Sequence, residues 1–87
     1  MSDEFIQRIV KLIAKAQKVP PDTITLDSRF DELNIDSMDA VEILFELETE
    51  FDVIIPDDQM RSMQTVREVA ESVEKLMAEK VSGATAP

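Results

Sequence analysis

The stretch Asp36-Ser37-Met38-Asp39-Ala40-Val41-Glu42, residues 36–42, opens a helix that we expect to run from Ser37 to Phe51. Asp36 suits the N-cap position, and Asp39 falls at the third helical position. Ser37 is then the first helical residue, where backbone N–H groups lack intrahelical partners and the helix dipole is positive. A phosphate attached to Ser37 would be well placed there, although a serine at a helix start usually has no chemical role.

The rest of this helix carries apolar side chains on two separate arcs, taking about 100° per residue. A core face is formed by Ala40, Ile43, Leu44, Leu47 and Phe51. The second arc, about 140° away, holds Met38, Val41 and Phe45. A small fold cannot bury both arcs in the ordinary way, so the second arc is predicted to be a docking patch. The alternative is that another element, such as the loop before the helix, covers it.

Acidic side chains surround the second arc, and the helix contains no Lys or Arg. The acids in and beside the helix are Asp36, Asp39, Glu42, Glu46, Glu48, Glu50 and Asp52. Glu42 with Glu46, and Glu46 with Glu50, are like-charge pairs that mildly destabilise a helix. An apolar centre with an acidic rim predicts a recognition helix that docks onto basic patches of partner proteins.

The whole chain of 87 residues is long enough for one small domain, and its net charge is −10. The charge is uneven: residues 20–60 hold thirteen acidic side chains and one basic side chain, Arg29. This balance argues against binding to nucleic acid, whose phosphates need basic side chains, and against an anionic membrane surface. A basic protein partner is the expected counterpart.

The residue types that are missing exclude most catalytic machinery. The chain has no His and no Cys, which removes the commonest general base and the thiolate nucleophile. Its single glycine, Gly83, lies near the end, so no Gly-rich loop can hold a nucleotide phosphate. No apolar run approaches a membrane-spanning length, and the start of the chain is acidic. We therefore expect a cytoplasmic protein with no membrane insertion and no enzymatic activity.

Outward from residues 36–42, the sequence predicts three further helices. The first runs from Asp3 to Gln17, where apolar residues recur at helical spacing, and Pro20 ends it. A connection of residues 18–36 follows, and its regular apolar residues predict an ordered loop. A short third helix is expected from Asp57 to Ser62.

The fourth helix is predicted to begin after Thr65, which forms a capping box with Glu68. Residues 81–87 are small and polar and are expected to form a flexible tail after one domain of residues 1–80. No alternation long enough for a sheet is present. The predicted fold is therefore all-α, a four-helix bundle with a long first loop and a short third helix.

These features together resemble the acyl carrier protein family of fatty acid, polyketide and specialised lipid synthesis. The resemblance covers residues 5–77 and rests on the segments 30–33, 36–42, 47–52, 55–58 and 65–66. The letters Asp-Ser-Met alone would be a weak motif, whereas the whole pattern in an acidic helical chain is specific. The family fold is a four-helix bundle of the kind predicted above.

The resemblance implies that Ser37 receives 4′-phosphopantetheine from coenzyme A through a phosphopantetheinyl transferase (holo-ACP synthase). The terminal thiol of that arm holds acyl groups as thioesters, so the chain is a carrier whose reactive group is imported. The implied partners are acyltransferases, ketosynthases and other acyl-processing enzymes with basic docking patches, and the expected state is a monomer. The predicted partner surface consists of Asp36, Met38, Asp39, Val41, Glu42, Phe45 and Glu48.

The family also shelters acyl chains in an apolar space between the second and third helices. The candidates for lining it in this chain are Leu44, Leu47, Ile55, Met60 and Met63. The two Met side chains are adaptable and suit such a space, and they suit an ordinary core equally well.

Two positions depart from the family pattern. Met38 stands where Leu is commoner, which is a nearly volume-conserving exchange. Asn34 stands where Gly is usual, and Asn tolerates left-handed backbone angles well, so the turn can survive. The Gly-Gly-His-Ser type motif of peptidyl carrier domains is absent, which disfavours amino-acid carriage and leaves a D-alanyl carrier open.

Two other interpretations remain open. The chain could be an acidic helical module that binds a basic protein without modification, in which case Ser37 is dispensable. It could instead bind a divalent cation through Asp57 and Asp58, in which case binding is saturable and stoichiometric. No spacing matches an EF-hand loop, so no dedicated metal site is predicted. The pathway and the acyl chain are likewise left open.

Overall fold

The computed structural model describes residues 2–83, with side chains up to residue 80. Within this range the chain forms four α-helices and no strand. The helices are α1 (Asp3–Gln17), α2 (Ser37–Phe51), α3 (Asp57–Ser62) and α4 (Val66–Gly83), and a 3₁₀ turn, η1 (Pro21–Thr23), follows α1. The predicted all-α architecture is confirmed, and α1, α2 and α3 have the predicted bounds.

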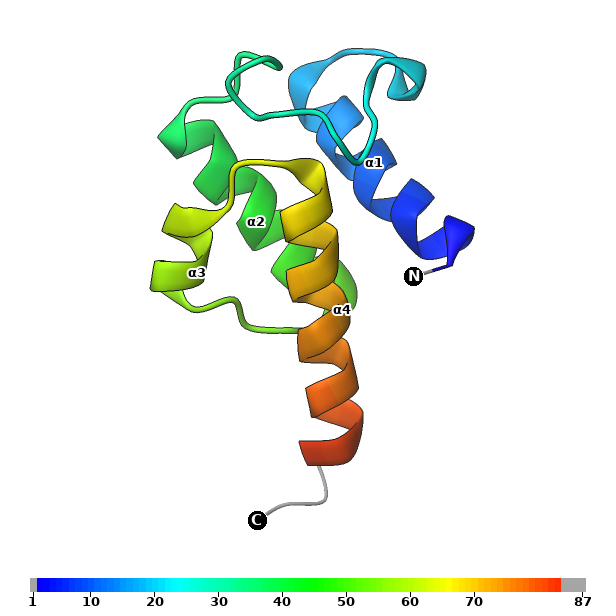
Figure 1. Cartoon of the computed structure of the whole chain (residues 1–87), viewed down its shortest axis with the longest axis vertical. Helices are drawn as coiled ribbons and strands as arrows, with labels where there is room; N and C mark the ends of the chain where they lie inside the picture. The colour runs from blue at the N-terminus through cyan, green and yellow to red at the C-terminus, as the bar shows by residue number, and fades with distance from the viewer. Residues whose placement is uncertain (1, 84–87) are drawn as a thin grey trace.

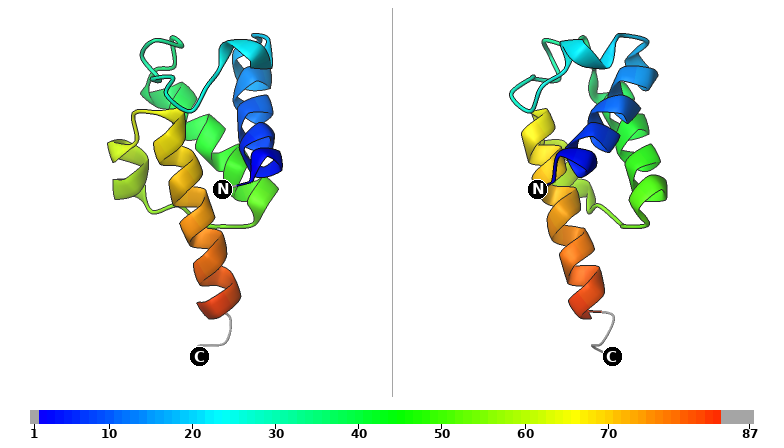
Figure 2. Two further views of the ribbon diagram at one scale, coloured as in Figure 1. Left: turned by 45° about the vertical axis from the view of Figure 1, so that its right-hand side comes forward. Right: turned by 90° about the vertical axis from the view of Figure 1, so that its right-hand side faces the viewer.

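The helices pack around α2 and α4. α1 lies against both of them, α3 contacts α2, and the loop after α1 crosses the end of the bundle at which α2 begins (Figure 1). The last turns of α4 extend past the ends of the other helices in every view (Figure 2). α4 continues to Gly83, three residues beyond the boundary expected at residue 80. Residues 84–87 of the predicted tail lie outside the described range.

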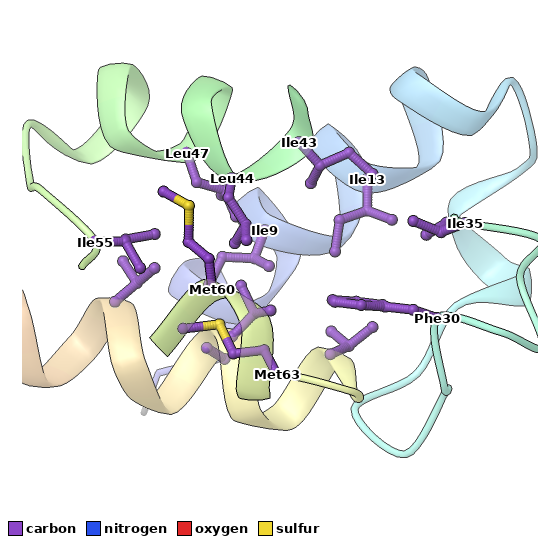
Figure 3. Close-up of a cluster of buried hydrophobic side chains, with 14 of the residues drawn as sticks. Ile9, Ile13, Phe30, Ile35, Ile43, Leu44, Leu47, Ile55, Met60 and Met63 are labelled. Atoms are coloured by element: carbon purple, nitrogen blue, oxygen red, sulfur yellow. The ribbon is translucent and has the colours of Figure 1, made fainter. Parts of the chain in front are cut away.

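The core is a single cluster to which every α-helix contributes, and it contains no buried polar side chain in the described part of the chain. Its fully buried larger members are Ile9, Ile13, Leu44, Leu47, Val66, Val69 and Val73. Figure 3 shows side chains of α1, α2 and α3 converging on one another in this cluster. Burial of this apolar surface, at about 25 cal/mol per Å², is the main force that holds the helices together.

The helix ends follow local capping rules. The Ser2 hydroxyl accepts a hydrogen bond from Phe5 N at 3.1 Å and caps α1. At the start of α4, Glu68 N donates to the Thr65 hydroxyl at 3.2 Å, and the Glu68 carboxylate accepts from Gln64 N at 3.1 Å. The predicted cap by Thr65 is confirmed, whereas the Glu68 carboxylate bonds Gln64 N–H, one residue before the N–H that a standard capping box uses.

The connection between α1 and α2 is ordered, as predicted, because it is anchored in two ways. Ile24, Phe30 and Ile35 are buried in the core. In addition, its backbone pairs with the start of α4: Phe30 N donates to Gln64 O at 2.9 Å, and Val66 N donates to Ser28 O at 3.1 Å. This pairing forms an isolated antiparallel bridge between Arg29 and Thr65, and no pattern in the sequence predicts it.

Candidate functional site

Ser37 is the first residue of α2, and its side chain is exposed. Asp36 precedes it in an extended conformation, with φ −84° and ψ −177°. Its carboxylate accepts a hydrogen bond from Asp39 N at 2.8 Å, which satisfies one of the free N–H groups at the helix start. The predicted cap is therefore confirmed, and the Ser37 hydroxyl remains accessible.

The turn before α2 depends on Asn34, which has φ 59° in the left-handed region. Leu33 N donates to Phe30 O at 3.1 Å, and Ile35 N donates to the same oxygen at 2.9 Å. The reversal lets Ile35 enter the core and leaves Asp36 and Ser37 at the surface. Asparagine thus takes the left-handed position here, as expected from its tolerance of these angles.

A cavity of about 400 Å³ opens beside Ser37, between the loop, the first turns of α2, and α3. Its apolar lining is supplied by Phe30, Ile35, Ala40, Val41, Met60 and Met63. Its polar lining comes from Arg29, Asp31, Asp36, Ser37, Arg61 and Gln64. The site therefore combines an exposed hydroxyl with an adjacent, largely apolar hollow.

The cavity agrees only in part with the residues predicted for an acyl pocket. Met60 and Met63 line it. Leu44, Leu47 and Ile55 do not line it, because they are packed in the core with exposed fractions of 2% or less. Figure 3 shows the Met60 side chain reaching from α3 toward Leu44 and Leu47. Phe30 and Ile35 were not predicted to line it, because their loop positions gave no sign that they share a cavity with Met60 of α3.

One ion pair stands at the edge of this cavity. Arg29 donates to both oxygens of Asp31, from Nε to Oδ1 at 3.2 Å and from Nη2 to Oδ2 at 3.4 Å. This hydrogen bond lowers the pKa of Asp31 and raises the pKa of Arg29. Arg29 N also donates to the Glu32 carboxylate at 3.1 Å. Asp31 therefore already compensates the charge of the Arg29 guanidinium, and the charges of Glu32 and Glu68 contribute further attraction.

The predicted docking patch on α2 lies open to solvent. Met38, Val41 and Phe45 have exposed fractions of 74%, 38% and 55%. The loop leaves them uncovered, so the alternative that another element buries this arc is wrong for the described chain. Glu42 and Glu46 are also exposed, whereas Asp39 is partly buried beside its capping partner.

The structure places Glu48 and Ile54 in positions that the sequence did not indicate. The Glu48 carboxylate accepts a hydrogen bond from Ile55 N at 2.7 Å, so it holds the connection between α2 and α3. Ile54 is 82% exposed, between the buried Val53 and Ile55. Burial thus alternates along residues 53–55, but all three residues are apolar, so no pattern in the sequence predicts that Ile54 faces outward.

Neither a metal cluster nor a membrane-spanning helix is found in the described residues. No group of three His, Cys, Asp or Glu side chains is arranged to hold a metal ion within residues 2–83. No helix in the same range is long and apolar enough to cross a bilayer. Asp57 and Asp58 lie in the first turn of α3 and are exposed.

Comparison with known proteins gives a consistent match. Residues 7–73 match the family described as "Phosphopantetheine attachment site". The chain is 40% identical over 78 residues to an acyl carrier protein of Amoebophilus asiaticus (strain 5a2), and the match covers 88% of this chain and 98% of that protein.

Solved structures have the same fold. An acyl carrier protein from Thermotoga maritima superposes with a TM-score of 0.78 at 24% identity, covering 87% of this chain and 89% of that chain. The hexanoyl acyl carrier protein of the actinorhodin polyketide synthase from Streptomyces coelicolor superposes with a TM-score of 0.71 at 26% identity, covering 91% and 93%. The likeness therefore extends over nearly the whole of each chain.

Proposed function

This chain belongs to the acyl carrier proteins, a phosphopantetheine-bearing family, and from that premise we propose that Ser37 is the residue to which its 4′-phosphopantetheine is attached. The observation that supports Ser37 is its position: an accessible hydroxyl at the start of α2, within the matched segment and beside an apolar cavity. When bound, the group supplies a terminal thiol on which acyl groups are carried as thioesters. The protein is thus a carrier in acyl metabolism.

The residues around Ser37 fit such a group. Ser37 is exposed, so a transferase can reach its hydroxyl. Attachment would form a bond between Ser37 Oγ and the phosphorus next to the pantetheine, break the pyrophosphate bond of coenzyme A, and release adenosine 3′,5′-bisphosphate and the hydroxyl proton. The free N–H groups of the first turn favour a phosphate at this end of α2. The adjacent cavity of about 400 Å³ offers apolar surface to the chain that follows the phosphate.

The partner surface that we propose comprises Asp36, Met38, Asp39, Val41, Glu42 and Phe45. Its exposed apolar residues suit burial against a protein, and its carboxylates suit a basic patch on a transferase or an acyl-processing enzyme. Glu48 belongs less directly, because its carboxylate is hydrogen-bonded to Ile55 N. Catalysis is supplied by these enzymes, and the cytoplasm is the compartment in which we place the protein.

For the acyl chain, we propose the cavity that Met60 and Met63 line. Flexible thioether side chains can change rotamer and so adjust the volume of the cavity to an occupant. If an acyl chain enters, the methyl resonances of Met60 and Met63 shift when the holo-protein is acylated, whereas unchanged resonances would leave both as core residues.

The attachment site is tested by intact-mass analysis. Incubation with coenzyme A and a phosphopantetheinyl transferase is expected to raise the mass by one phosphopantetheine group, and Ser37→Ala is expected to abolish the increase. Ser28→Ala is the matched control, because Ser28 also lies in the acidic middle of the chain but not at the start of α2. A mass increase that survives in Ser37→Ala would place the site elsewhere, and no increase in the native chain would favour an unmodified interaction module.

A further inference from the structure

The few basic side chains in the middle of the chain line the cavity beside Ser37. From residue 19 to residue 66 the sequence contains only two basic side chains, Arg29 and Arg61. The two come from different elements, the loop and α3, yet both line this cavity. In a segment so rich in carboxylates, this convergence makes the edge of the cavity a favourable place for an anion.

The two arginines are not equally available. Arg29 is bonded to both carboxylate oxygens of Asp31, so its charge is already compensated. Arg8 and Arg67 are likewise paired, with Glu50 at 2.6 Å and with Asp27 at 3.0 Å. Within residues 2–83, Arg61 is the only arginine whose side chain makes no hydrogen bond or ion pair. It therefore offers a free guanidinium to the cavity.

A phosphate joined to Ser37 would be stabilised by a nearby guanidinium. The phosphodiester adds a negative charge next to Asp36, in the same cavity wall as Asp31. The Asp36 carboxylate already occupies the N–H of Asp39, so it competes with the phosphate for the donors of the helix start. Like charges at close range repel, and a nearby cation offsets that repulsion.

We propose that Arg61 binds the phosphate that joins the arm to Ser37 and so directs the arm across the cavity. This inference rests on attachment at Ser37. A guanidinium presents a planar fork of N–H donors that matches two oxygens of a phosphate. Held in this way, the arm passes over the apolar lining formed by Phe30, Met60 and Met63.

The first test needs no variant. Proton–nitrogen correlation spectra of the apo- and holo-protein report on the Nε–H of each arginine. The Arg61 Nε–H signal is expected to shift and to exchange more slowly with water in the holo-protein, whereas that of Arg67 is expected to stay in place. An unchanged Arg61 signal in a sample whose mass proves that the arm is attached would overturn the inference and leave the proposed function intact.

The second test removes the arginine. In Arg61→Gln, the phosphorus NMR signal of the holo-protein is expected to move toward that of a free phosphodiester, and the rate of thiol alkylation is expected to rise about two- to fivefold, which corresponds to one exposed ion pair. Arg67→Gln changes the net charge equally at a site away from the cavity and is expected to match the native protein. Equal spectra and alkylation rates in both variants would contradict a role for Arg61.

Discussion

At the scale of single residues, Asn34 determines how the chain enters α2. Its φ of 59° allows Ile35 N to donate to Phe30 O at 2.9 Å, and α2 begins directly after this turn. Left-handed angles cost an ordinary residue about 1–2 kcal/mol, because Cβ approaches the backbone carbonyl. The free-energy cost of these angles is lower for asparagine and glycine. The identity of residue 34 therefore contributes to the position of Ser37.

This backbone angle leads to a prediction for stability. Asn34→Ala is expected to lower the free energy of unfolding by about 1 kcal/mol, because alanine must adopt the same φ without a compensating side chain. Urea unfolding followed by circular dichroism measures the change. Asn34→Gly is the control and should remain within about 0.5 kcal/mol of the native protein. Equal losses in both variants would mean that the Asn side chain, and not φ, stabilises the turn.

At the scale of elements, α2 presents three different surfaces. Leu44 and Leu47 face the core, and Phe45 faces solvent. Glu42 is exposed on the outer side of the helix, whereas the Glu48 carboxylate accepts a hydrogen bond from Ile55 N at 2.7 Å. We therefore expect two glutamates of one acidic helix to have separable roles, Glu42 in the proposed partner binding and Glu48 in stability.

These roles can be separated by substitution. Glu42→Lys is expected to weaken binding to a basic partner enzyme about two- to tenfold at low salt, mainly through slower association, with stability retained. Glu48→Ala is expected to lower the free energy of unfolding by about 1–2 kcal/mol, because it leaves the Ile55 N–H without its acceptor. Surface plasmon resonance and urea unfolding measure the two effects.

Glu46→Ala is the matched control for Glu48→Ala. Glu46 is exposed on the same helix, and its side chain makes no hydrogen bond within residues 2–83. Its stability should stay within about 0.5 kcal/mol of the native value. Unchanged partner affinity of Glu42→Lys at low salt, where screening is weakest, would remove Glu42 from the partner surface.

The elements also show what the sequence can and cannot predict. The bounds of α1, α2 and α3 were predictable because their end signals are local: Pro20 follows α1, Asp36 caps α2, and Pro56 precedes α3. The role of Glu48 was not predictable, because it depends on the path that residues 53–55 take back toward the helix. The boundary of the cavity was missed for the same reason, since Phe30 of the loop and Met60 of α3 come to line one cavity only through the tertiary fold.

At the scale of the whole molecule, uneven charge sets the response to solution conditions. Thirteen acids lie between residues 20 and 60, and among the described ion pairs only Arg29 with Asp31 has both partners inside that segment. Lys80 donates to Asp52 and Arg8 to Glu50, so bases of α4 and α1 offset part of the repulsion at the end of α2. The remaining carboxylates repel one another in the folded state.

We therefore expect salt to stabilise the protein. About 0.5 M NaCl should raise the melting temperature by about 4–8 °C, which corresponds to roughly 1 kcal/mol for a domain of this size. Thermal melts followed by circular dichroism measure the effect. The double variant Glu42→Gln/Glu46→Gln removes two like-charge pairs, Glu42 with Glu46 and Glu46 with Glu50, and should show a smaller response to salt.

Magnesium chloride at equal ionic strength distinguishes screening from a specific site. Diffuse screening predicts a gradual rise in melting temperature with no saturation at low concentration. A saturable, stoichiometric response would contradict screening and revive the interpretation that Asp57 and Asp58 bind a cation.

The pairing of the loop with the start of α4 has a consequence for biosynthesis. Ser28 O and Phe30 N find their partners only when residues 64–66 are present, and Ser37 lies inside the span that this contact closes. A chain growing from the ribosome cannot complete that closure until residue 66 has emerged from the exit tunnel. The surface around Ser37 therefore cannot be completed before residues 64–66 are available to pair with the loop.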